Sequence, residues 1–161
     1  MLGLRFYSRI EKALRKIDMK ARMEMKVRPE IIISTVDSER LERLLDSLPN
    51  NDFIGKVELE YELARAKIVK PKEVPPSVVT MNSTVRFKVE SSNDEFELTL
   101  VYPKDSDLSG KTLSILAPIG SALLGLSQGD EIEWPKPGGG VLRVQIHEVA
   151  YQPERSGDFH L

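Results

Sequence analysis

Three prolines between residues 71 and 76 divide the chain into two parts with different sequence patterns. In much of the part before them, apolar residues recur at the three- and four-residue steps of amphipathic helices, whereas β-branched and aromatic runs typical of strands follow. Because proline lacks a backbone N–H and restricts the residue that precedes it, such a cluster is typical of a linker. We therefore predict a domain boundary near residues 70–77, with a mainly helical part before it and a sheet after it.

Length and composition exclude several kinds of protein. The 161 residues, 40% of them apolar, suffice for one ordinary domain with a hydrophobic core plus an appendage. The chain has no cysteine, which excludes disulfides, thiolate zinc sites and cysteine nucleophiles. It has no run of eighteen uncharged apolar residues, and its N-terminus lacks the features of a secretory signal. We therefore expect a soluble cytoplasmic protein without a membrane span.

The first 28 residues form a basic extension. They contain nine Lys and Arg against three acidic residues, although the whole chain has a net charge of −2. Their apolar residues recur at helical spacing, which predicts an amphipathic helix. These residues are Phe6, Ile10, Leu14, Ile17 and Ala21. Such a helix suits an anionic membrane surface or an acidic protein, but the segment also fits a loosely ordered leader, or a reading frame that starts at Met23 or Met25.

The rest of the chain is acidic, with a net charge of −8. Direct binding to nucleic acid requires a cationic surface that displaces counterions from the phosphates, so an acidic body disfavours it. We expect the partners to be proteins, and any contact with DNA to be indirect.

The part before the prolines is expected to start with a short strand and a helix. Three isoleucines at residues 31–33 predict an extended segment. Residues 36–48 predict a helix, because their leucines fall on one face. The residues of that face are Leu41, Leu44, Leu45 and Leu48, and the candidates for the N-cap are Ser34, Thr35 and Asp37. Glu39 and Arg43, four residues apart, form a supporting pair.

A second segment, residues 56–69, fits two structures. Apolar residues alternate strictly with glutamates from Val57 to Leu63, as in a strand, but the Glu, Leu, Ala, Arg and Lys content suits a helix. Periodicity alone leaves the choice open. If the segment is helical, the short turn at residues 49–52 implies an antiparallel pair with the preceding helix.

The part after the prolines predicts an α+β fold, in which a mainly antiparallel sheet carries one short helix. The expected strands are residues 84–89, 96–102, 113–116, 131–134 and 141–149, and the expected helix is residues 121–126. Residues 91–94 and 137–140 are turns, and the glycines of the second turn do not form a phosphate-binding loop, because no Gly-Lys-Ser/Thr sequence follows them.

Candidate catalytic residues are scarce. The two histidines, His147 on the outward face of its strand and His160 beside the C-terminus, cannot be combined into a metal site or a triad. Most carboxylates fall in loops or on outward strand faces, where solvated surface is the ordinary role. Asp52, in the predicted turn between the helices, is the exception, because an exposed acid there could approach a metal or a basic protein. We expect no enzyme activity and no cofactor.

Several stretches resemble a known family. They are "VVTMNSTVRF", "LTLVYP", "LSILAPIGSALLGLSQGDEIEW", "PGGG" and "EVAYQPERSGDFHL". They are similar to the Rnk family, described as regulators of nucleoside diphosphate kinase, and residues 113–134 also resemble the Gre transcript-cleavage factors. The resemblance implies three regions: the basic extension at residues 1–28, a short strand and coiled-coil finger at residues 29–74, and an FKBP-like C-terminal domain at residues 77–161. It also implies that residues 56–69 are helical.

The resemblance further implies a site and a partner. In the Gre group the C-terminal domain binds the rim of the RNA polymerase secondary channel, and acidic residues at the fingertip help to hold a catalytic metal. Pro118 stands in the position of the proline of the Gre "SPI" turn, with Ile119 beside it and Leu116 where Gre proteins have a more polar residue. The tip offers Asn50, Asn51 and a single carboxylate, Asp52. An arm of thirteen residues is about 20 Å long, roughly half a Gre finger.

The resemblance implies a protein that docks at the secondary channel of RNA polymerase and competes with Gre-type factors, and the two departures predict that it does not stimulate transcript cleavage. We expect a monomer. It would meet DNA only through the polymerase complex. A regulator that acts through nucleoside diphosphate kinase is a second interpretation, which rests only on the description of the family. A peptidyl-prolyl isomerase is a third, suggested by the FKBP-like fold and opposed by the few aromatic residues available for its pocket.

Overall fold

The computed structural model describes residues 28–49, 54–90, 92–135 and 138–161. The basic extension before residue 28 and the tip residues Asn50, Asn51 and Asp52 therefore lie outside the described residues. No helix in the described ranges is both long and apolar enough to cross a membrane.

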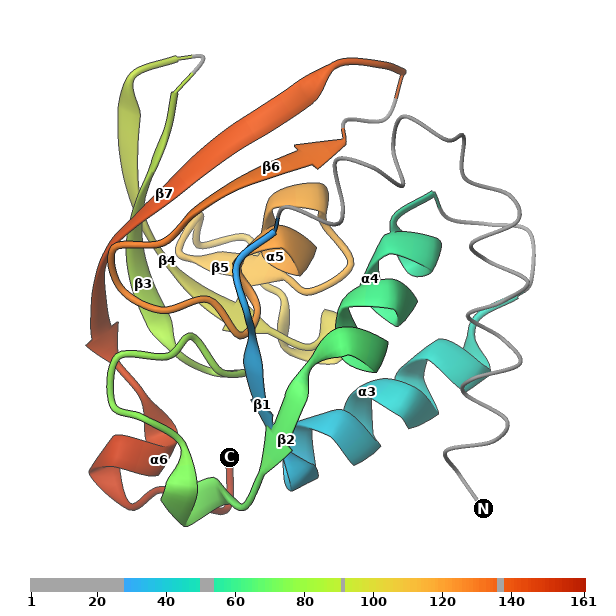
Figure 1. Cartoon of the computed structure of the whole chain (residues 1–161), viewed down its shortest axis with the longest axis vertical. Coiled ribbons are helices and arrows are strands. Elements are labelled where there is room, and N and C mark those ends of the chain that lie inside the picture. The colour runs from blue at the N-terminus through green and yellow to red at the C-terminus, as the bar shows by residue number, and fades with distance from the viewer. Residues whose placement is uncertain (1–27, 50–53, 91, 136–137) are drawn as a thin grey trace.

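The part before the prolines contains two helices between two short strands (Figure 1). The elements are β1 (Ile32–Ser34), α3 (Thr35–Ser47), α4 (Ile54–Arg65) and β2 (Lys67–Val69). The predicted helix α3 is confirmed, and the Ser34 hydroxyl caps it by accepting the Asp37 backbone N–H at 3.0 Å. The expected Glu39–Arg43 pair also forms, at 3.7 Å, but both side chains are exposed and its contribution to stability is small.

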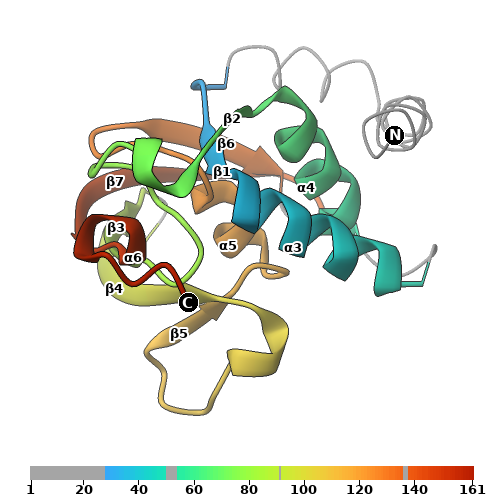
Figure 2. The same cartoon turned by 90° about the horizontal axis from the view of Figure 1, so that it is seen from below.

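The second predicted helix is right for most of its length and wrong for its last turn. Helix α4 ends at Arg65, and β2 pairs in parallel with β1, with Ile33 opposite Ile68. The Lys67 backbone N–H donates to the Ile31 carbonyl at 2.9 Å, so a partner more than thirty residues away decides this conformation. Figures 1 and 2 show α3 and α4 lying at an angle to each other, with β1 and β2 at one end of the pair. Packing as a coiled coil stays a prediction.

The part after the prolines is a five-stranded sheet with strand order β5-β4-β3-β7-β6. The strands are β3 (Thr84–Val89), β4 (Asp94–Val101), β5 (Thr112–Ser114), β6 (Glu131–Pro135) and β7 (Val141–Tyr151). All five lie within a few residues of their predicted positions, and only β4–β5 is a parallel pair. The register places Val85 opposite Leu98 and Phe87 opposite Phe96, whose rings stack with centroids 5.5 Å apart. The mixed α and β class is as predicted, whereas the likeness to FKBP stays a prediction.

The short helix of the sheet begins earlier than predicted. Helix α5 spans Pro118–Leu123, whereas the sequence pattern predicts residues 121–126. Proline is well suited to the first turn of a helix, because its missing N–H has no partner there in any case. Gly125, with φ of +77°, follows the end of the helix and lets the chain turn back toward β1.

A C-terminal helix that the sequence reading missed, α6 (Pro153–Ser156), ties the proline linker to the sheet. Gln152 caps it by accepting the Arg155 backbone N–H at 3.1 Å, and the Gln152 amide donates to the carbonyls of Pro75 and Val78. Proline at the start and Gly157 in the left-handed region just past the end are the signals that could have identified this helix.

One hydrophobic core joins the parts on either side of the prolines. The helix side chains in this core are Leu41, Leu45, Leu59 and Leu63, and they pack into one cluster with the inner residues of the sheet. Complete burial of a leucine is worth about 1.5–3 kcal/mol. In Figure 1, α5 lies between the sheet and α4, and α5 contacts both. The directions of the two long helices are therefore coupled to the sheet through packing.

Candidate docking surface

The residues predicted to dock, Leu116, Pro118 and Ile119, lie together in the turn that leads from β5 into α5. We call residues 116–119 the docking turn. All three side chains are half-buried, and Leu116 and Ile119 also pack against the core. The turn thus presents part of an apolar surface to solvent while its inner side is anchored.

Hydrogen bonds hold the docking turn in one conformation. The Ala117 backbone N–H donates to the Ser114 carbonyl at 3.0 Å, and the Leu116 backbone N–H donates to the Ser114 hydroxyl at 3.2 Å. The buried Ser121 hydroxyl donates to the Ile115 carbonyl at 2.6 Å. A turn with so many fixed backbone groups loses little conformational entropy on binding, which favours affinity.

Gly120 is a residue of this site that sequence reasoning missed. A Cβ atom at this position would lie 2.1 Å from the Ser114 carbonyl oxygen, a backbone atom that cannot move away cheaply. Only glycine therefore allows α5 to approach β5 this closely. The sequence signal that could have identified this close approach is the glycine that follows Pro118 and Ile119.

The second half of the predicted site, the fingertip with Asn50, Asn51 and Asp52, lies outside the described residues. The structure therefore brings together the three docking residues and leaves their relation to the tip a prediction. Helix α4, which begins just after the tip, contacts α5, which carries the docking turn.

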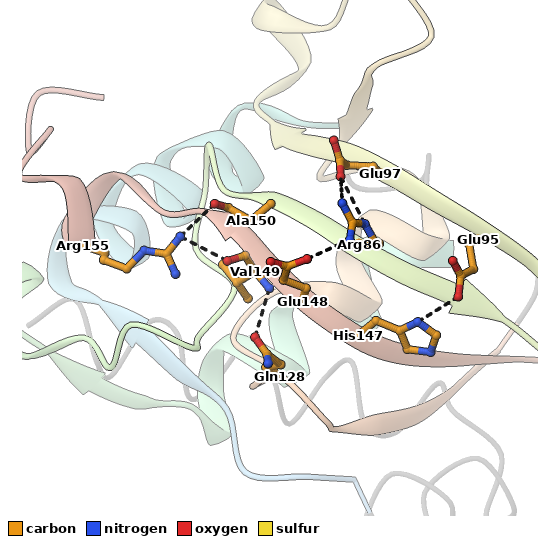
Figure 3. A network of polar contacts seen from close by, with 9 residues as sticks. All are labelled: Arg86, Glu95, Glu97, Gln128, His147, Glu148, Val149, Ala150 and Arg155. Atoms are coloured by element: carbon orange, nitrogen blue, oxygen red, sulfur yellow. Dashed lines mark hydrogen bonds and ion pairs between the residues drawn. The ribbon is translucent and has the colours of Figure 1, made fainter.

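A charged network covers the outer face of the sheet (Figure 3). Arg86 lies between Glu97 and Glu148, at 2.7 and 2.9 Å, and His147 Nδ1 lies 3.1 Å from Glu95. Arg86, Glu95, His147 and Glu148 help to line an open hollow of about 470 Å³. His147 is on the outward face of β7, as predicted.

The polar groups of this hollow are occupied by structural contacts. Arg155 donates to the carbonyls of Pro76, Val149 and Ala150, and Gln128 accepts the Val149 backbone N–H at 3.4 Å (Figure 3). The register of β7 against β3 shifts at His147 and again at Ala150, and the contacts to Val149 and Ala150 satisfy backbone groups at the second of these irregularities. In the described ranges no three His, Cys, Asp or Glu side chains are grouped so that they could hold a metal ion. The network is best explained as support for the sheet.

Two buried polar clusters, neither of them expected from the sequence, connect the long helices to the body. In the first, Glu62 of α4 lies between Arg28 at 2.6 Å and Arg65 at 2.9 Å, and the Arg28 guanidinium lies over the Trp134 ring, 4.4 Å from its centroid. The only early signal for this cluster was an acid at the end of a predicted helix with an arginine three residues on. We call Arg28, Glu62, Arg65 and Trp134 the clamp.

The second cluster surrounds Asp37 in the first turn of α3. Its carboxylate accepts the Met81 backbone N–H at 3.1 Å and the Tyr102 hydroxyl at 3.4 Å. Burial, and next the nearby Glu154 carboxylate, raise the pKa of Asp37 to about 7, although the Met81 hydrogen bond, Arg40 and Tyr102 oppose this shift. Burial, together with the charge of Asp37, also raises the pKa of Tyr102. Asp37 therefore carries a proton far more readily than an ordinary aspartate.

The sheet with its docking turn defines the class of the second part. Residues 70–151 match the family model for the C-terminal region of the transcription elongation factors GreA and GreB, and residues 29–69 match the model for the Rnk N-terminus. The chain thus combines a region that matches the Rnk N-terminus with a region that matches the Gre C-terminus.

Comparison with whole proteins identifies the family. The chain is 44% identical over 134 residues to the regulator of nucleoside diphosphate kinase from Escherichia coli (strain K12), which covers 83% of this chain and 98% of that protein. GreA from Helicobacter hepaticus is 35% identical over 95 residues, which cover 59% of this chain and 58% of that protein. The chain belongs to the Rnk family.

One solved structure is similar over most of the chain. The GreA/GreB-type elongation factor from Nitrosomonas europaea is 70% identical in sequence and superimposes with a TM-score of 0.62, over 76% of this chain and 99% of that chain.

Proposed function

We propose that this protein is a regulator that binds RNA polymerase through the docking turn and competes there with Gre-type factors without stimulating transcript cleavage. One observation carries the proposal: Leu116, Pro118 and Ile119 form a rigid, half-exposed apolar turn in a domain that matches the Gre C-terminal model. An ordered apolar surface of this kind is typical of the anchor of a protein interface.

The proposed lack of cleavage rests on the length and chemistry of the helix pair. Helices α3 and α4 contain 13 and 12 residues, so each is about 18–20 Å long. The turn between them offers Asp52 as its one carboxylate, whereas the resemblance to Gre proteins calls for an acidic pair at the tip of a longer arm. A short arm with one acid is poorly suited to hold a catalytic metal within the polymerase.

The experiment is a displacement assay on core RNA polymerase carrying a labelled Gre factor, with RNA cleavage followed in the same reaction. We expect the protein to displace the Gre factor and cleavage to fall in step. If a large excess of the protein displaces nothing, the proposal is wrong.

Matched variants locate the docking surface. Ile119→Ser removes an apolar group from the docking turn, and Ile68→Ser removes one from β2, whose Ile68 is 43% exposed. We expect Ile119→Ser to weaken displacement about tenfold, a change typical of an interface anchor, and Ile68→Ser to leave it unchanged. Equal effects of the two variants would contradict docking through this turn. Replacement of Asn50, Asn51 and Asp52 by serine is expected to weaken displacement modestly.

A second candidate is regulation through nucleoside diphosphate kinase, which the name of the Escherichia coli relative favours. Co-purification of this protein with the kinase, and not with RNA polymerase, would favour it over the polymerase proposal.

A further inference from the structure

The buried carboxylate of Glu62 forms ion pairs with two arginines from different segments of the chain. Its side chain is 2% exposed, and its two oxygens contact Arg28 and Arg65 separately. Arg65 also donates to the Pro29 carbonyl at 2.6 Å. The chain before β1 and the last turn of α4 are therefore held to the same carboxylate.

The contact continues from Arg28 to the sheet. The guanidinium is itself almost completely buried and lies over Trp134 of β6, whose ring is 1% exposed. A desolvated cation over an indole is attracted to the ring more strongly than an exposed one, and this contact favours one orientation of the guanidinium. The clamp thereby connects α4 to a strand that is distant in sequence.

Glu58 is a further buried carboxylate beside the clamp. It lies one turn before Glu62 on α4, and no hydrogen-bond partner for its Oε2 or for Arg28 Nε lies among the described residues. One of these atoms is an acceptor and the other a donor, and Arg28 acts electrostatically on Glu58. Groups of this kind are normally joined by a direct bond or a buried water after a small adjustment.

We infer that Glu62 is a positioning residue, which fixes the direction of α4, and with it the finger, relative to the docking turn. The inference rests on the proposed function for its consequence, since the finger matters only if the docking turn binds polymerase. Apolar packing allows small rotations of one helix on another, whereas a buried ion pair of fixed geometry specifies one arrangement. Because α4 contacts α5, a rotation of α4 moves the finger relative to residues 116–119.

The test removes the charge of Glu62 and keeps its shape. In Glu62→Gln the buried Arg28 side chain and the partly buried Arg65 side chain lose their shared counter-charge, while in the control Glu97→Gln an exposed ion pair of Arg86 is lost in the same way. The full-length chain has no cysteine, so Ala64→Cys on α4 and Gln145→Cys on the outer face of β7, both exposed, can carry a pair of spin labels without background. The distance distribution between the labels reports the direction of α4.

We expect one narrow distribution in the otherwise unaltered protein and in Glu97→Gln, and a broadened or displaced distribution in Glu62→Gln. A folded Glu62→Gln protein with an unchanged distribution would overturn the inference. If Glu62→Gln does not fold, Arg28→Met gives the same test from the other partner, because it leaves Glu62 paired with Arg65. Fluorescence of Trp134, the one tryptophan of the chain, checks that the clamp has changed.

Displacement of the Gre factor measures the functional consequence separately. If α4 has the direction that allows docking in only a fraction of the molecules, the apparent affinity for polymerase equals the full affinity multiplied by that fraction. We therefore expect Glu62→Gln to displace the Gre factor about three- to tenfold less well. A broadened distribution with unchanged displacement would overturn the role of α4 direction in docking. A broadened distribution in a protein that displaces nothing even when unaltered supports the clamp and refutes the proposed function instead.

Discussion

The buried carboxylate of Asp37 makes a prediction about the pH dependence of stability. Its pKa is raised to about 7 in the folded protein from an ordinary value of 3.8, mainly by burial. The folded state therefore holds a proton more tightly than the unfolded state. It follows that the contribution of Asp37 to the free energy of unfolding is most favourable below pH 4, falls as the pH rises from about 4 to 7, and stays low above that range.

The size of the effect follows from the shift. A difference of about 3 pH units corresponds to about 4 kcal/mol, because each unit is worth about 1.4 kcal/mol. The charged and titratable groups that face Asp37 are Arg40 on the same helix, Tyr102 after β4, and Glu154 on α6. Asp37→Asn removes the titration and keeps an oxygen that can accept the Met81 backbone N–H.

The assay is urea unfolding at intervals from pH 4 to pH 8, followed by Trp134 fluorescence. Other carboxylates titrate in both proteins, so the quantity of interest is the stability of Asp37→Asn minus that of the unaltered protein. We expect this difference to rise by about 4 kcal/mol between pH 4 and pH 8, with Asn favoured at high pH. In Glu154→Gln the rise should be smaller and complete at a lower pH, because the like charge that helps to raise the Asp37 pKa is gone. Parallel stability curves for Asp37→Asn and the unaltered protein would refute the reasoning.

Two further predictions concern the docking turn and catalysis. Gly120→Ala should destabilise the protein by about 1–3 kcal/mol and weaken Gre displacement, because its Cβ meets the Ser114 carbonyl; an unchanged urea midpoint would contradict this. The protein should not isomerise a proline-containing peptide in a protease-coupled assay, since Phe87 and Trp134 are buried in the core and the described hollow on the sheet is lined with charged side chains. Turnover above the uncatalysed rate would refute the second prediction.

Local patterns were sufficient where neighbouring residues decide the structure. The alternation at residues 84–89 predicted β3 with its observed bounds, because one face of that strand packs on the core. The cap of α3 is also local, since the Ser34 hydroxyl and the N–H that it accepts are three residues apart; Ser34 was one of three predicted candidates, and the predicted start at residue 36 is one residue from the observed one. The docking residues lie together because they fall within four residues of the chain, at the start of α5.

Long-range contacts explain what the sequence reading missed. Residues 67–69 leave the helical pattern because β1 supplies a parallel partner, and no property of the segment alone identifies that partner. Arg28, Glu62 and Glu58 looked like charges of a solvated surface, which is the usual place of such residues. They are buried because three segments far apart in sequence meet at Trp134.

The two buried clusters hold the helix pair at the same end. Asp37 lies in the first turn of α3 and Glu62 in the last turn of α4, next to the paired strands β1 and β2. Of the two helices, α4 packs against α5, the helix of the docking turn. A lost charge at Glu62 should therefore redirect α4 about its base while the sheet stays folded, whereas a change at Asp37 should act mainly on α3 and on stability. Comparison of Glu62→Gln with Asp37→Asn in the displacement assay therefore distinguishes an effect of the direction of α4 from an effect of protein stability.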